Sequence, residues 1–162
     1  MSGEDMMFFL IVWSLIGGLL FFGYVVLVFR TGLAYSARNP DGTLKDKIPR
    51  SGRLAMGSFL VLIIAFLVCA NFIGLPGQID RLRFWTLFML NYALYAILFL
   101  YDTFFIDAFV LGIWRPAFLR LPEEMGRQSM KRHILASIPV GLLAGVILAA
   151  LSTWISRGLR SI

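Results

Sequence analysis

The feature that most constrains this chain is a set of four long segments without lysine, arginine or histidine. They cover residues 6–29, 54–75, 84–114 and 134–156. Each is longer than the about 20 residues that an α-helix needs to cross about 30 Å of hydrocarbon. We therefore expect an all-α membrane protein, built as an antiparallel bundle of four transmembrane helices. Residues 1–162 are expected to form a single integral membrane domain.

Composition supports the same class. The chain is 59% hydrophobic and 15% charged, whereas soluble domains average about 45–50% apolar and about 25% charged residues. The net charge of +6 is not accompanied by a basic helix or an aromatic-basic module, which argues against a nucleic-acid partner. Glu4 and Asp5, rather than basic residues, precede the first segment, so we expect a retained helix and not a signal peptide.

The basic residues predict the orientation in the membrane. Most lie between the first and second segments or between the third and fourth: Arg30, Arg38, Lys45, Lys47, Arg50, Arg53, Arg115, Arg120, Arg127, Lys131 and Arg132. Only Arg81, Arg83, Arg157 and Arg160 lie elsewhere. The positive-inside rule then places both termini outside and the two longer loops on the cytoplasmic side of an inner cell membrane. These residues also predict contact with anionic lipid headgroups.

Within the second of these loops, a proline and two acids resemble a helix start. Pro122 is followed by Glu123 and Glu124, which suit the first turn and the positive end of the helix dipole. This predicts a short interfacial helix over residues 122–132.

Small residues recur at every fourth position of the last segment, where close helix packing in lipid is favoured. This helix-packing seam consists of Ser137, Gly141, Gly145, Ala149 and Thr153. It predicts tight packing either within one chain or between two copies. We accordingly expect a homo-oligomer or a larger membrane complex.

Two aspartates interrupt the third segment. Measured from Trp114 along an α-helix, Asp107 lies about 10 Å in, near the cytoplasmic boundary, and Asp102 about 18 Å in, near the midplane. Asp107 is within reach of a predicted cytoplasmic rim of Arg115, Lys131, Arg132 and His133. Asp102 has no basic residue in any of the four segments. An acid at that depth costs at least about 2.5–3.5 kcal/mol and often marks function.

At 100° per residue, Asn91, Tyr95 and Asp102 share one stripe, with Asp107 140° further round than Asp102. We expect this stripe to face inward and Asn91 to pair with Asn71. Nearer the cytoplasm, Ser58, Tyr101, Asp102, Thr103, Asp107 and Ser137 lie at overlapping depths. They predict either a small polar site for binding or proton coupling, or a hydrogen-bonded cluster that fixes helix register.

The remaining residue types indicate little cofactor chemistry. His133 is the only histidine and Cys69 the only cysteine, so we expect no metal site and no cofactor. Four tryptophans are expected in the interface belts: Trp13, Trp85, Trp114 and Trp154.

Three functions fit the sequence. The first is an accessory or scaffold membrane protein that forms a complex through its helices. The second is a small oligomeric transporter or proton- or cation-coupled carrier that uses Asp102. The third is a membrane enzyme acting on lipid or quinone at the cytoplasmic interface.

Overall fold

The computed structural model describes residues 2–33, 45–119, 121 and 127–160, with side chains described from residue 135 onward in the last range. Regular structure in these ranges is helical throughout. The elements are α1 (Gly3–Arg30), α3 (Arg50–Gly74), α4 (Phe84–Leu100), η1 (Tyr101–Trp114), η2 (Ala117–Leu119) and α5 (Arg127–Arg160). Within the described chain, four helices are long and apolar enough to span a membrane: Gly3–Arg30, Arg50–Gly74, Phe84–Trp114 and Leu135–Arg160. The prediction of four such helices is confirmed.

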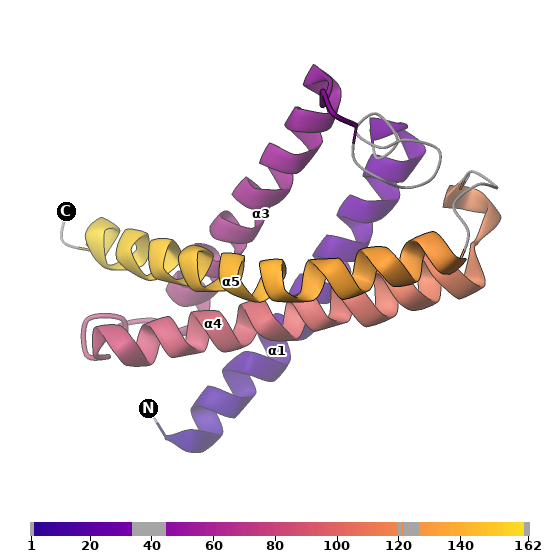
Figure 1. Cartoon of the computed structure of the whole chain (residues 1–162). Helices are drawn as coiled ribbons and strands as arrows, with labels where there is room; N and C mark the ends of the chain where they lie inside the picture. The colour runs from indigo at the N-terminus through magenta and orange to yellow at the C-terminus, as the bar shows by residue number, and fades with distance from the viewer. Residues whose placement is uncertain (1, 34–44, 120, 122–126, 161–162) are drawn as a thin grey trace.

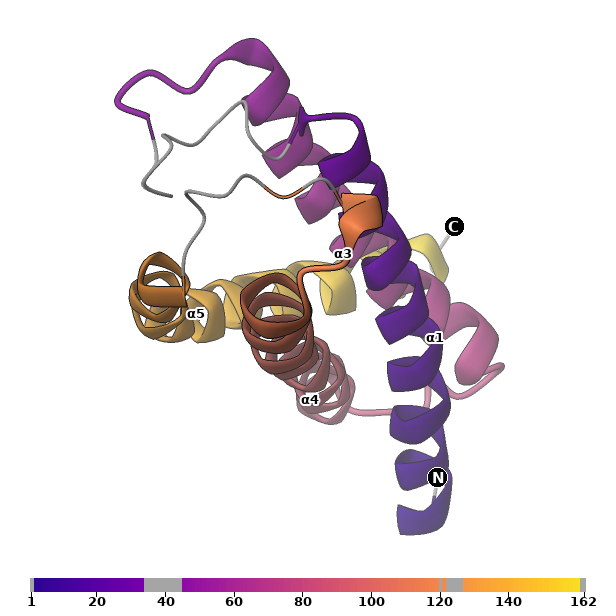
Figure 2. The same cartoon turned by 90° about the vertical axis from the view of Figure 1, so that its right-hand side faces the viewer.

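The helices form two crossed layers (Figures 1 and 2). In the front layer of Figure 1, α5 runs antiparallel to α4 and η1. Behind it, α1 and α3 run antiparallel to each other and cross the front layer at a steep angle. Helix α3 contacts α5 more extensively than it contacts α4, its neighbour in sequence. The arrangement therefore differs from a bundle in which all four helices lie alongside one another.

Close contacts between the helices depend on glycines, both within and between the layers. A Cβ at Gly17 of α1 would lie 2.7 Å from Leu98 of α4 and 2.8 Å from Phe66 of α3. A Cβ at Gly74 of α3 would overlap Phe9 and Trp13 of α1. Because the missing side chains permit near contact of the backbones at these points, the helices meet at crossings rather than along their whole length.

Trp13 differs from the other three tryptophans in its packing. It is half-buried against the core and lies edge-on to Phe66, with ring centroids 5.8 Å apart. Trp85, Trp114 and Trp154 are 67%, 55% and 72% exposed, as a lipid-facing tryptophan would be. Trp13 instead fills the α1–α3 crossing beside Gly74.

The third segment is not α-helical throughout. Helix α4 continues without interruption into η1, a π-helix. In a π-helix each backbone N–H bonds to the carbonyl five residues earlier, instead of four as in an α-helix. Aromatic rings stack along η1: Tyr101 on Phe105, Phe105 on Phe109, and Phe109 on Trp114, with centroids 5.0, 5.7 and 6.4 Å apart. The segment ends at Arg115, which adopts φ 47° and donates its N–H to the carbonyl of Val110 at 2.8 Å.

The predicted interfacial helix is only partly within the described chain. Residues 122–126 lie outside it. Residues 127–132 form the first turns of α5, which continues to Arg160. A separate helix ending at residue 132 is therefore wrong, because the helical hydrogen bonding that begins at Arg127 continues directly into the apolar segment.

Candidate functional site

The α4–α5 interface contains polar contacts within the predicted spans. The side-chain amide of Asn91 donates to Oγ1 of Thr153 at 2.9 Å, and Thr153 donates to the carbonyl of Ala149 at 2.7 Å. Further along, the Tyr95 hydroxyl donates to the carbonyl of Gly141 at 2.9 Å. Asn91 and Thr153 are fully buried. The predicted inward direction of Asn91 and Tyr95 is therefore found, and the partner is α5.

Two aromatic rings of α4 fill the small-residue seam of α5. A Cβ at Gly145 would overlap Tyr95, and one at Gly141 would overlap Phe99. The two rings are stacked on each other, with centroids 6.0 Å apart and an interplanar angle of 4°. Ala149 and Thr153 are fully buried along the same seam. These members of the seam thus pack within one chain, which is the first of its two predicted uses.

Asp102 lies one residue into η1, half-buried. Tyr101 directly precedes it, and Tyr95 lies seven residues earlier, about two turns away on the same helix. Among the described side chains, no hydrogen bond or ion pair reaches the Asp102 carboxyl group. Tyr101 itself packs on α1, where a Cβ at Gly18 would lie 3.5 Å from its ring. The two tyrosines nearest Asp102 on its helix thus contact two different helices, Tyr95 contacting α5 and Tyr101 contacting α1.

The π-helix changes the relation between Asp102 and Asp107. A turn of a π-helix contains more residues than the 3.6 of an α-helix, so residues five apart differ less in direction around the axis. The 140° separation expected from an α-helix is therefore too large. Asp107 is also half-buried, and its pairing with the basic rim stays a prediction, because the side chains of Lys131, Arg132 and His133 lie outside the described part.

The predicted cytoplasmic group is divided between different contacts. Ser58 bonds at 2.8 Å to the hydroxyl of Tyr24, which also donates to the carbonyl of Ala55 at 2.6 Å. Ser58 thus joins α3 to α1, whereas the described neighbours of Asp102 are Tyr95 and Tyr101. Thr103 is buried and Ser137 is half-buried on α5. The Ser58 hydroxyl is thus engaged at the α1–α3 contact, and its membership of a polar site with Asp102 stays a prediction.

The predicted Asn71–Asn91 pair is wrong. The Asn71 amide donates instead to Oγ of Ser156 at 2.9 Å, so each amide bonds a different hydroxyl of α5. Ser152 and Ser156, both fully buried, were not identified from the sequence. Their position three and seven residues after Ala149 places them on the seam side of α5, and this spacing was the signal available.

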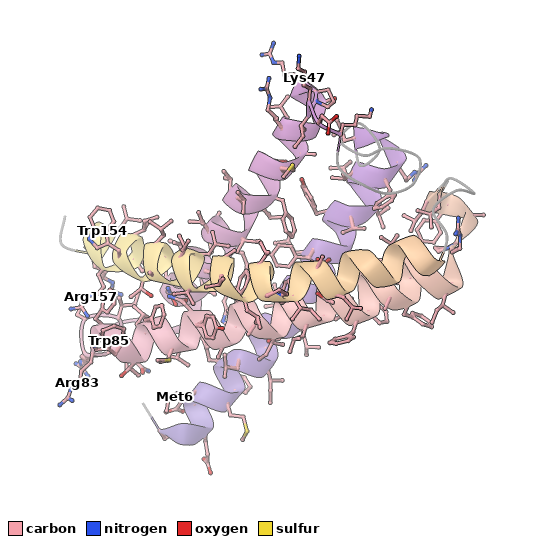
Figure 3. All side chains as sticks on the ribbon, in the orientation of Figure 1. Met6, Lys47, Arg83, Trp85, Trp154 and Arg157 are labelled. Atoms are coloured by element: carbon pink, nitrogen blue, oxygen red, sulfur yellow. The ribbon has the colours of Figure 1, made fainter. Side chains whose placement is uncertain are left out.

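Two arginines tie the end of α5 to the α3–α4 link. Arg157 donates to the carbonyl of Leu82 at 3.2 Å, and Arg160 forms an ion pair with Asp80 at 3.2 Å. Figure 3 shows Arg83, Trp85, Trp154 and Arg157 together at this end of the molecule, with Lys47 at the opposite end. In the part of the chain that the structure describes, histidine, cysteine and acidic residues form no group of three that could hold a metal ion.

Comparison with protein-family models, with curated proteins and with solved structures found no match.

Proposed function

We propose that this chain is a complex-forming accessory protein of the inner cell membrane, with both termini outside and the two longer loops in the cytoplasm. The four apolar helices support membrane insertion. The clustering of Trp85 and Trp154 beside arginines at one end (Figure 3) suits a membrane–water interface. Lys47, at the other end, belongs to the more basic side.

The observation that carries the proposal is that the Asp102 carboxyl group has no pairing group among the described side chains. Acids within transmembrane segments usually pair with basic groups or with backbone, because burial of an isolated charge in hydrocarbon is unfavourable. Asp102 is half-buried beside two tyrosines and has no such partner among the described side chains. The pairing group is then a lysine or arginine at similar depth in another membrane protein.

A second copy of the chain does not meet this requirement. Its four apolar segments contain no lysine, arginine or histidine, so it carries no basic group at the depth of Asp102. Gly141 and Gly145, which suited a dimer seam, are covered by Phe99 and Tyr95 of the same chain. Both facts favour a different protein as the partner over a homo-oligomer.

Purification from native membranes in a mild detergent, followed by native mass spectrometry, tests the proposal. The variants are Asp102→Asn and Asp102→Leu, with Asp80→Asn as a matched control that removes an acid from the exposed α3–α4 link. The native chain and the control should retain a partner with a lysine or arginine inside a membrane span, and both Asp102 variants should lose it. Retention by Asp102→Leu would contradict the proposal.

A second function, a proton- or cation-coupled carrier, is favoured by the position of the Asp102 carboxyl beside Tyr95, whose hydroxyl bonds to α5. These groups place titratable and hydrogen-bonding atoms at the α4–η1–α5 contact. The carrier function requires that purified protein in liposomes catalyse proton or cation flux, and that Asp102→Asn abolish this flux. Equal flux from native and variant protein would exclude the use of this carboxyl group.

A further inference from the structure

The strongest site outside the Asp102 region lies where α3, α4 and α5 meet. We call it the amide junction, and its members are fully buried polar residues: Asn71, Asn91, Ser152, Thr153 and Ser156. Two consecutive turns of α5, one with Ser152 and Thr153 and the next with Ser156, face an amide from α3 and an amide from α4.

The hydrogen bonds at the junction leave oxygen atoms without partners. The amide nitrogens of Asn71 and Asn91 are bonded to Ser156 and Thr153. The Oδ1 atoms of both asparagines and Oγ of Ser152 are buried without a partner. Exchanging the nitrogen and oxygen positions of either amide would leave its nitrogen unpaired instead. Buried polar groups are normally hydrogen-bonded, so three unpartnered atoms in one buried cluster point to a ligand.

We propose that the amide junction binds an internal water molecule. Water donates two hydrogen bonds and accepts others, and buried waters typically make about three bonds to otherwise unsatisfied polar groups. It therefore matches two acceptor oxygens, from Asn71 and Asn91, and a hydroxyl, from Ser152, that can donate or accept.

The charges nearby favour a neutral ligand over a cation. The junction contains no carboxylate, and Arg157, which follows Ser156 directly, brings a positive charge to the same end of α5. A cation held by neutral oxygens in this surrounding would lack the counter-charge that a buried ion requires. Fully buried leucines on the same faces of α3 and α4, Leu67, Leu87 and Leu94, separate the water from the lipid and make it long-lived.

Magnetic resonance can detect this water directly in lipid bilayers. The chain has three asparagines, Asn39, Asn71 and Asn91, so labelling asparagine with ¹⁵N gives few side-chain amide signals. Magnetisation transferred from water should reach the buried amides of Asn71 and Asn91. Ser152→Ala should reduce this transfer at least severalfold while both amide signals persist, and the same substitution at Ser14 of α1 should leave it unchanged.

Three results would overturn the proposal. The first is a junction that receives no magnetisation from water. The second is an equal loss of magnetisation transfer in Ser14→Ala and Ser152→Ala, which would show that the water is not bound at the amide junction. The third is a change in the two amide signals when sodium, potassium or ammonium replaces choline at constant ionic strength, which would indicate a cation as the ligand.

Discussion

Gly145 of α5 lies so close to Tyr95 of α4 that a Cβ at position 145 would overlap the tyrosine ring. The same ring is stacked on Phe99, and its hydroxyl bonds to the carbonyl of Gly141. Tyr95 is therefore held on three sides, and it lies beside Asp102. The absence of a side chain at position 145 is a condition for this arrangement.

Gly145→Ala should destabilise the protein by about 1–3 kcal/mol, the range seen when an atom is forced into a packed interior. Gly158→Ala is the matched control on the same helix, because a Cβ there would meet nothing within 4 Å. Its effect should stay within about 0.5 kcal/mol. Reversible unfolding in mixed micelles measures both free energies, and equal effects would contradict the packing of α5 on Tyr95.

The Asn91–Thr153 hydrogen bond should appear as a coupling energy. Asn91→Ala, Thr153→Val and the double variant form a cycle from which the pairwise contribution can be isolated. Interhelical hydrogen bonds in a membrane average about 0.6 kcal/mol, with a maximum of about 1.7 kcal/mol. We expect the coupling energy of Asn91 and Thr153 to lie in this range. Strict additivity of the two single effects would show that the bond does not contribute to stability.

The two arginines at the end of α5 should differ in their response to salt. The Arg160–Asp80 pair is on the surface, with side chains 31% and 60% exposed, so Arg160→Ala should cost no more than about 1 kcal/mol. At 1 M salt, where the screening length is about 3 Å, this loss should vanish. Arg157→Ala removes a partly buried bond to the Leu82 carbonyl and should cost more at every salt concentration. The reverse order would refute these assignments.

Single cysteines test the proposed orientation. In a Cys69→Ser background, Arg81→Cys places a thiol in the α3–α4 link and Lys47→Cys places one before α3. A membrane-impermeant maleimide added to intact cells should label only the Arg81→Cys variant. The Lys47→Cys variant should react after permeabilisation. If only the Lys47→Cys variant were labelled in intact cells, the orientation would be the reverse of the proposed one.

Helix positions could be predicted from the sequence because long uncharged segments leave few alternatives in lipid. The seam of α5 was identified for a similar reason, since glycine and alanine at every fourth position define one face. The direction of Asn91 and Tyr95 also followed from helical periodicity, and the structure agrees. These are properties of one helix at a time.

Relations between helices were harder to predict. The close contacts of α1 with α3 and α4 depend on Gly17 and Gly74 meeting particular aromatic and leucine side chains, which no single-helix pattern specifies. The Asn71–Asn91 pair was inferred from depth alone. In the structure the two amides bond instead to the hydroxyls of Ser156 and Thr153 on α5. The π-helix was missed because residues 84–114 are apolar on all sides, so their pattern does not distinguish a turn of 3.6 residues from a wider one.

The central claim is that Asp102 recognises a basic group in the membrane span of another protein. The most direct test reconstitutes the fluorescently labelled chain with an acceptor-labelled, leucine-rich transmembrane peptide bearing one central lysine. Energy transfer should exceed that for the same peptide with leucine at the centre, and Asp102→Asn should remove the difference. Equal transfer to both peptides, or a difference unaffected by Asp102→Asn, would contradict the claim.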